Sequence, residues 1–267
     1  MNINEIFQKA NTGNINDLIP IKSIENPFEY FQISETDLLP TYEKVCELYG
    51  KDIADDCYYF DGLIPEVVYF NKETYVIVKL TGAILTQISK EELRKQINFL
   101  AVDIKKDGLE KHQFFIPSEF QMSLMDYYLS THSIQDYSSF IDMYAHNEYN
   151  FSQLSRDKLN LIFQQPHKKI GQKFIKTLPE TVTIYRGEGD KSTPVEKALS
   201  WTLSKEVAFF FACKNSNTGS SIYTAQIKRE AILDYLDDRN EEEILAFPED
   251  VKILNKVDLP SVMEVSE

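Results

Sequence analysis

The stretch "KALSWTLSKEVAFFFA", residues 197–212, changes its pattern in the middle and thereby indicates how the C-terminal half of the chain folds. Ser200, Trp201 and Thr202 form a short strand pattern in which Trp201 faces the core and the two hydroxyls share the opposite face. Ser204 is a favoured helix N-cap residue, and the apolar run behind it, with Val207, continues at helical spacing. We therefore expect a strand followed at once by a helix.

The segments on either side of this stretch are rich in β-branched and aromatic residues. Strands are predicted in "LPETVTIYRG" (178–187), "SSIYTAQIK" (220–228), "EEEILAF" (241–247) and "VKILNKV" (251–257). The polar run "KNSNTGS" supplies the turn out of the helix. Sequential strands with few helices between them favour a compact, largely antiparallel sheet structure.

The N-terminal half has a more mixed pattern. Two β-rich runs, "EVVYF" and "TYVIVKLTG", flank a polar turn and predict a hairpin. Ser89 and Glu92 have capping-box spacing at the start of a predicted helix, "SKEELRKQINFLAVDI". Further helices are predicted at 118–130, 135–147 and 155–177, the last interrupted near Pro166. We expect an α+β protein with two domains, a mixed N-terminal unit over 1–133 and a second domain over 134–267.

Composition limits the class of protein. The 267 residues are 43% hydrophobic and 12% aromatic, which is enough to bury a large core. The net charge of −14 is uneven: residues 1–150 carry 12 Lys and Arg against 24 Asp and Glu, or −12, and residues 151–267 carry 16 against 18, or −2. The acidic half would repel phosphate backbones, which argues against tight nonspecific nucleic-acid binding there. The acidic N-terminal half could bind a basic partner, or its charge could serve solubility alone.

Several features point to the cytoplasm. The N-terminus, "MNINEIFQKA", has no basic region followed by a long apolar run, so no secretory signal is predicted. The most apolar window, "TYVIVKLTGAILTQI", contains Lys79 and is too short to cross a bilayer. The three cysteines form no CxxC pair, and the four histidines have no metal-ligand spacing with them. We expect a soluble cytoplasmic protein with no structural metal.

The stretch "RNEEEIL", residues 239–245, puts three glutamates before an apolar run. If it is a strand, Glu241 and Glu243 point to one surface and Glu242 to the other. A carboxylate pair in a cleft would stabilise a cation and take up a proton. A solvated edge strand would have the same sequence, so this fragment alone does not decide between the two.

A second fragment, "IYRG", places Arg186 at the end of a strand with Gly187 behind it. A guanidinium can bind a phosphate group through two hydrogen bonds, and glycine lets a backbone approach a ligand closely. Taken singly, Arg186 is more often a surface ion-pair partner, and Ser200 and Thr202 are ordinary strand residues. The order is more specific: arginine, then Ser-x-Thr before a helix, then Glu-x-Glu before aliphatic residues.

In this order the C-terminal half resembles the arginine, serine, glutamate class of mono-ADP-ribosyltransferases, the family of clostridial binary toxins and vertebrate ecto-enzymes. "YRG" is similar to the family's first motif, "SWTLSKEVAFFFA" to its Ser-Thr-Ser strand and helix with Trp in the middle and Thr third, and "RNEEEIL" to its Glu-x-Glu motif. The resemblance covers roughly residues 140–258 and implies an ADP-ribosyltransferase-like fold, a largely antiparallel two-sheet core with flanking helices.

The resemblance also implies roles for particular residues. Glu243 would stabilise the cationic ribose of the transition state, and Ser200 would orient Glu243. Arg186 would bind the pyrophosphate of NAD or an adjacent hydroxyl. Gly187 would offer backbone groups to the carboxamide, and Phe209 or Phe210 would stack near nicotinamide, although "AFFFA" suits a core-facing helix equally well. The residues expected to contact NAD are Arg186, Gly187, Ser200, Thr202, Phe210 and Glu243, and those expected to be catalytic are Glu243, Glu241, Arg186 and Ser200.

The implied function is the transfer of ADP-ribose from NAD, as a substrate, to a macromolecule, by an intracellular toxin, a defence protein or a phage-related effector. In the family, glutamate at the position of Glu241 accompanies modification of protein arginine, while a nucleobase of RNA or DNA is the alternative acceptor. If the protein is a toxin, a neutralising antitoxin is expected as a partner, and no membrane partner is expected. The alternatives are NAD hydrolysis without an acceptor, or an idle interaction module of a toxin-antitoxin complex.

Overall fold

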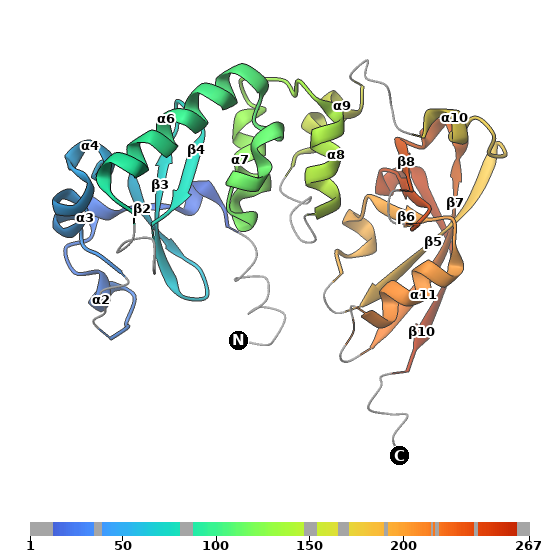
Figure 1. Ribbon diagram of the computed structural model, residues 1–267. Coiled ribbons are helices and arrows are strands. Elements are labelled where there is room, and N and C mark those ends of the chain that lie inside the picture. Colours follow the sequence, from blue (N-terminus) through green and yellow to red (C-terminus); the bar gives the residue numbers. More distant parts are fainter. Residues whose placement is uncertain are drawn as a thin grey trace. The chain divides into compact units, whose positions relative to one another are not determined.

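The chain has an α+β fold divided into two compact units, Met1–Gln165 and Pro166–Glu267 (Figure 1). Each unit has its own antiparallel sheet. The computed structural model describes residues 13–34, 39–80, 88–146, 154–164, 171–189, 192–214, 216, 219–237 and 240–260.

The sheet of the first unit has four strands in the order β1-β2-β3-β4. They are β1 (Ile19–Pro20), β2 (Cys57–Asp61), β3 (Pro65–Asn71) and β4 (Val76–Lys79). The predicted hairpin is confirmed, since β3 and β4 pair antiparallel around the polar turn. Strand β2, which pairs with β3, was not predicted.

Helices accompany this sheet. They are α2 (Pro27–Tyr30), α3 (Tyr42–Tyr49), α4 (Lys51–Ala54), α6 (Lys90–Asp107), α7 (Gln121–Tyr128), α8 (Tyr137–His146) and α9 (Arg156–Phe163), with the 3-10 turns η1 (Ile15–Asp17), η2 (Ile21–Ser23), η3 (Glu110–Phe115) and η4 (Ser118–Phe120). The capping box of α6 is confirmed: the Ser89 hydroxyl accepts the Glu92 amide at 3.3 Å, and the Ser89 amide donates to the Glu92 carboxylate at 2.9 Å.

The boundary between the units lies later than the expected position between residues 133 and 134. Helices α8 and α9 pack with the first unit because polar contacts tie both to it. The Lys158 ammonium forms a 2.8 Å ion pair with Asp126 of α7. The buried Glu110 carboxylate accepts the backbone amide of Asp136 at 2.7 Å, just before α8. Such contacts join residues far apart in sequence, so a change in composition along the chain could not reveal them.

The second unit has a six-stranded sheet in the order β10-β7-β5-β6-β9-β8. Its strands are β5 (Thr181–Gly189), β6 (Ser200–Thr202), β7 (Ser220–Lys228), β8 (Asp234–Leu236), β9 (Glu243–Leu245) and β10 (Val251–Leu259). Two three-stranded ladders, β10-β7-β5 and β6-β9-β8, meet through the single pair Tyr185 and Thr202. The two sheets expected for this half are therefore joined into one.

Two helices and three short turns complete the described part of this unit. They are α10 (Gln172–Ile175), α11 (Lys205–Lys214), η6 (Val195–Lys197), η7 (Arg229–Ala231) and η8 (Pro248–Asp250). The predicted N-cap of α11 is confirmed, because the Val207 amide donates to the Ser204 hydroxyl at 3.3 Å. The helix predicted over 155–177 is present as α9 and α10, and the predicted break at Pro166 lies outside the described residues.

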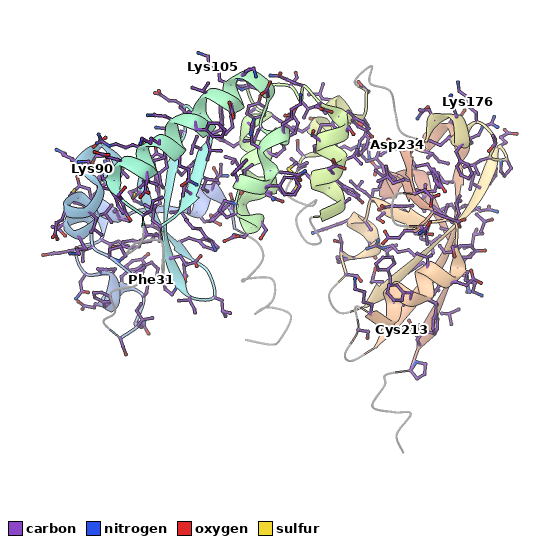
Figure 2. All side chains as sticks on the ribbon, in the orientation of Figure 1. Phe31, Lys90, Lys105, Lys176, Cys213 and Asp234 are labelled. Carbon is purple, nitrogen blue, oxygen red and sulfur yellow. The ribbon has the colours of Figure 1, made fainter. Side chains whose placement is uncertain are left out.

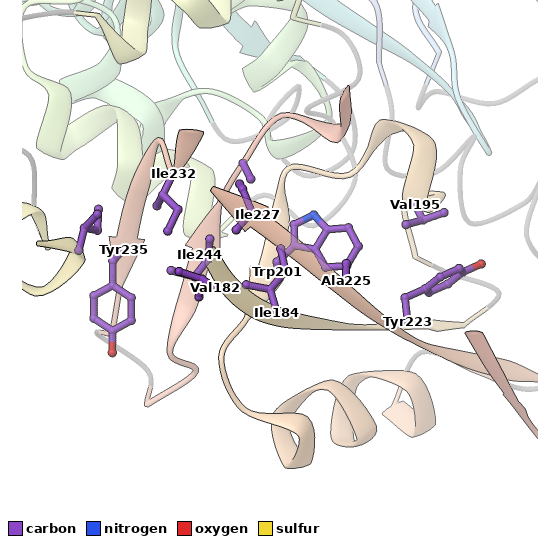
Figure 3. Packing of buried hydrophobic residues seen from close by; sticks show 12 residues of the cluster. Val182, Ile184, Val195, Trp201, Tyr223, Ala225, Ile227, Ile232, Tyr235 and Ile244 are labelled. Atoms are coloured by element: carbon purple, nitrogen blue, oxygen red, sulfur yellow. The ribbon is translucent and has the colours of Figure 1, made fainter. Parts of the chain in front are cut away.

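The core of the second unit lies around Trp201, which is 2% exposed (Figure 3). Side chains from neighbouring strands, among them Ile184 of β5 and Ile244 of β9, pack with it in one cluster. The prediction that Trp201 faces the core is confirmed. Burying an aromatic side chain of this size stabilises the sheet by roughly 3 kcal/mol, so the strand between Ser200 and Thr202 is firmly placed.

Among the described residues, no helix has the length and apolar character needed to cross a membrane. All three cysteines are free thiols, and Cys213 lies exposed on α11 (Figure 2).

Candidate active site

Arg186, Ser200 and Glu243 come from three strands that are neighbours in the sheet, β5, β6 and β9. In the register of the ladders, Thr202 lies opposite both Tyr185 of β5 and Glu243 of β9. The order of strands thus brings together three motifs that are separated along the chain.

The Ser200 hydroxyl donates a hydrogen bond to Glu243 Oε1 at 2.5 Å. This length is typical of a hydroxyl bound to an ionised carboxylate, and such bonds are about twice as strong as those between neutral groups. Glu243 is only 6% exposed, so its orientation depends on this contact more than it would at the surface. The pair predicted from sequence is therefore assembled and partly shielded from water.

Arg186 acts on the same serine through the backbone. Its Nη1 donates to the Ser200 carbonyl at 2.8 Å, and its Nη2 donates to the Thr193 carbonyl at 2.6 Å. Arg186 thus fixes the start of β6, where Ser200 lies, and orders the segment that leads to it.

The strand containing Glu243 is shorter than expected. β9 begins at Glu243, while Asn240 and Glu242 have positive φ angles of 55° and 47°. This left-handed backbone belongs to a turn, so the predicted alternation of Glu241, Glu242 and Glu243 along one strand was wrong. Glu241, two residues before Glu243, is half-buried, and the turn sets the direction of its side chain.

Thr202 holds this turn in place. Its hydroxyl donates to the Glu241 carbonyl at 2.7 Å and accepts the Ser204 amide at 3.0 Å. The Leu203 amide also donates to the Glu242 carbonyl at 3.1 Å. Thr202 is buried, so the contacts seen for the hydroxyl that was expected to bind NAD are with the protein backbone.

Gly187 permits a close approach, and the group that approaches is helix α11. A Cβ atom at this position would lie 1.8 Å from the Ala208 carbonyl oxygen and 2.5 Å from the Ala212 amide nitrogen. The absence of a side chain at Gly187 is therefore required for packing of α11 on β5, a reason that the motif alone did not indicate.

The phenylalanines of α11 expected near nicotinamide are on the surface. Phe210 is 58% exposed and contacts the edge of the Phe211 ring, with centroids 5.4 Å apart. Phe209 is also exposed. Neither ring belongs to the core, so of the two interpretations of "AFFFA" the core-facing one does not hold for these residues.

Glu188 was not selected from the sequence, although its position two residues after Arg186 on a strand places both on one face. Burial raises the pKa of its carboxyl, while Arg186 and the Val195 amide lower it. Its Oε2 atom is buried without a hydrogen-bond partner in the described part of the chain. Glu188 lines a cavity of about 360 Å³ together with Ser221 and Asp258.

No group of three or more His, Cys, Asp or Glu side chains among the described residues is placed to hold a metal ion. Comparison with protein-family models, with curated proteins and with solved structures finds no significant match to this chain.

Proposed function

We propose that the second unit is an NAD-dependent mono-ADP-ribosyltransferase of the arginine, serine, glutamate class. The observation that carries the proposal is the 2.5 Å bond from Ser200 to Glu243, with Arg186 bound to the carbonyl of the same serine. Three motifs whose order resembles that family thus meet in one connected group of side chains.

The proposed role of Glu243 is electrostatic. In NAD the nicotinamide ring carries a positive charge, and its departure with the bonding electron pair moves that charge to the ribose. A carboxylate fixed beside the ribose therefore stabilises the transition state more than the ground state. Ser200 keeps the carboxylate in one orientation, so little reorganisation is needed during the reaction. The acceptor then forms a bond to the ribose carbon and releases its proton.

The residues present fit a dinucleotide with a pyrophosphate group. Arg186 binds the carbonyl of Ser200, and the Ser200 hydroxyl binds the Glu243 carboxylate. We assign the anionic pyrophosphate of NAD to Arg186 and the cationic ribose to Glu243. By the resemblance, Gly187, Thr202 and Phe210 would also contact NAD, although the contacts described above for Gly187 are with α11 and those for the Thr202 hydroxyl are with the backbone. Arg186 would both order β6 and bind the substrate.

Glu241 is the proposed acceptor-side residue. It is half-buried, and its backbone is fixed by the Thr202 hydroxyl. A second carboxylate can align a guanidinium and help to remove its proton, which favours protein arginine, and an amino edge on a nucleobase of RNA or DNA is the alternative acceptor.

The test is incubation of the full chain with labelled NAD in a cell lysate, comparing the wild type with Glu243→Gln. The variant should lose at least about two orders of magnitude in rate, because one preorganised electrostatic contact is worth roughly 3 kcal/mol in a transition state. Glu242→Gln is the matched control, since Glu242 is the exposed neighbour of Glu243, and it should keep most of the activity.

Separate protease and nuclease digestion of the labelled fraction then identifies the acceptor as protein or nucleic acid. Free ADP-ribose without any adduct would point to NAD hydrolysis instead of transfer. If NAD neither binds in calorimetry nor stabilises the protein, the proposal is wrong and an interaction module without catalysis is the better description. A labelled macromolecule would suit an intracellular toxin or defence effector, for which a neutralising antitoxin is the expected partner.

A further inference from the structure

Strand β10 forms an open edge of the second sheet. Among the described residues it pairs with β7 alone, at the end of the strand order (Figure 1). All residues from Lys252 to Asp258 are exposed, and the aliphatic side chains of Ile253, Leu254 and Val257 are 42%, 48% and 49% exposed. In an antiparallel strand every second residue directs its N–H and C=O away from its one partner, so this edge presents unpaired backbone groups.

The opposite edge of the sheet differs. All three residues of β8 are buried, and the Phe174 ring of α10 stacks on Tyr235 with centroids 4.1 Å apart. The backbone next to α10 approaches equally closely, since a Cβ on Gly171 would lie 2.4 Å from the Tyr235 carbonyl oxygen. One end of the sheet is therefore shielded by the unit's own chain, and the other is exposed over seven residues, Lys252 to Asp258.

The longest regular part of β10 is its second half, because the pairing with β7 runs over three residues from Val251 to Ile253 and over five from Asn255 to Leu259. The register shifts between Ile253 and Asn255, which marks a bulge, and from Asn255 to Leu259 each residue faces one residue of β7. In this part Lys256 lies opposite Tyr223, with its ammonium 5.7 Å from the ring centroid. This five-residue segment is the longest part of the edge that can accept another strand without distortion.

The charges of this segment are arranged symmetrically about Val257. Lys256 precedes it and Asp258 follows it, and the two form an ion pair of 3.0 Å along the edge. The Ser221 hydroxyl donates to Asp258 at 2.7 Å, so both charged side chains lie on the face of Tyr223 and Ser221. If a second copy of this segment is placed antiparallel to the first and centred on the same residue, each lysine lies opposite an aspartate.

We propose that two copies of this chain associate by antiparallel pairing of their β10 edges about a two-fold axis at Val257. In that arrangement Lys256 lies opposite the partner's Asp258, and Asp258 lies opposite the partner's Lys256. The exposed Val257 side chains meet at the axis, which removes apolar surface from water. Opposite charges directly across a ladder stabilise strand pairing.

Neighbouring registers are disfavoured by the same charges. A two-fold axis at Lys256 would put the two copies of Lys256 opposite each other. An axis at Asp258 would put the two copies of Asp258 opposite each other, and like charges in these positions destabilise strand pairing. A shift of one residue would also bring unlike faces of the two strands together. The bulge limits the ladder on one side, and Pro260, which has no N–H, limits it on the other, so the interface is small and the association is weak.

The experiment is sedimentation velocity on the full chain over a concentration series. The wild type should show a concentration-dependent equilibrium between monomer and dimer. Lys256→Asp and Asp258→Lys each place like charges opposite each other at two positions, so each should weaken association by roughly tenfold or more. An equimolar mixture of the two variants restores opposite charges in every pair and should associate like the wild type.

The mixture is also the control for folding, because variants that merely unfolded would not regain association together. A wild type that stays monomeric at every concentration would overturn the inference. So would single variants that associate as the wild type does, since that would place the contact on another surface. The inference does not depend on ADP-ribosyl transfer, because β10 contains none of the residues proposed for that reaction.

Discussion

Arg186, Ser200 and Glu243 form a sequence of contacts in which each residue orients the next. Arg186 binds the backbone of Ser200, and the side chain of Ser200 binds Glu243. A buried carboxylate is costly unless it accepts hydrogen bonds, and the Ser200 hydroxyl donates one of them to Glu243. The hydrogen bond from Ser200 that stabilises the buried Glu243 carboxylate also fixes its orientation. A carboxylate fixed in this way is what the proposed stabilisation of a cationic ribose requires.

Glu241 should separate the two halves of the proposed reaction. In Glu241→Gln, cleavage of NAD should fall by less than about tenfold, because Glu243 and Ser200 are unchanged. Transfer to a macromolecule should fall by at least about a hundredfold, because the amide cannot accept a proton from the acceptor. Release of nicotinamide and labelling of the acceptor are measured in the same sample. Equal losses in both would show that Glu241 acts on NAD itself.

Glu188 should give the stability of the protein a measurable pH dependence. Its folded pKa is raised by burial, so the ionised carboxylate costs stability once the pH rises above the folded pKa. Below the ordinary pKa of a glutamate both states are protonated and the cost is absent. Glu188→Gln should therefore match the wild type near pH 4 and be more stable near pH 7, by less than about 1 kcal/mol because water screens a half-buried group.

Urea unfolding at the two pH values measures this difference. A stability difference between Glu188→Gln and the wild type that is the same at both pH values would contradict the assignment, since a purely structural effect does not titrate.

At the scale of elements, the contact between β5 and α11 depends on the backbone at Gly187. Gly187→Ala would bring the new Cβ within 1.8 Å of the Ala208 carbonyl, so the helix must move away. We expect a loss of about 2 kcal/mol in the free energy of unfolding, typical of overpacking at a close contact. Cys213→Ala, on the exposed side of α11, should change it by less than about 0.5 kcal/mol. Equal effects of the two would show that α11 packs loosely.

Elements with a strong local pattern were predictable from the sequence. The alternation in "SSIYTAQIK" predicted β7, the run "VKILNKV" predicted β10, and Ser204 predicted the start of α11. Each of these signals lies within one element, where side-chain period and capping decide the backbone. The joining of two ladders through Tyr185 and Thr202 is a tertiary contact and has no local signature.

The candidate site was predictable in its residues and less so in its contacts. The sequence indicated Arg186, Ser200 and Glu243, and the strand order brings them together. It did not indicate that Glu242 adopts a left-handed backbone, because that conformation is imposed by the Leu203 and Thr202 contacts with the turn. It also missed Glu188, whose pKa is raised by burial in the folded sheet.

At the scale of the whole molecule, the two units have separate sheets and separate chemical character. The candidate site and the open β10 edge both lie in the second unit, while the first half of the chain carries most of the net charge, −12 of −14 by the counts of residues 1–150 and 151–267. The single tryptophan of the chain is Trp201, in the core of the second unit. Its fluorescence therefore reports on that unit alone.

This permits a test of whether the units unfold independently. Ser89→Ala removes the capping box of α6 in the first unit and should destabilise that unit by about 1 kcal/mol. If unfolding is independent, the loss of helical circular dichroism moves to lower urea, while the fluorescence transition of Trp201 stays where it is in the wild type. Gly187→Ala should do the reverse, moving the Trp201 transition first. If Ser89→Ala moves both transitions together, the two units unfold as one cooperative body. In that case a change in α6 of the first unit also destabilises the core around Trp201, which belongs to the second unit.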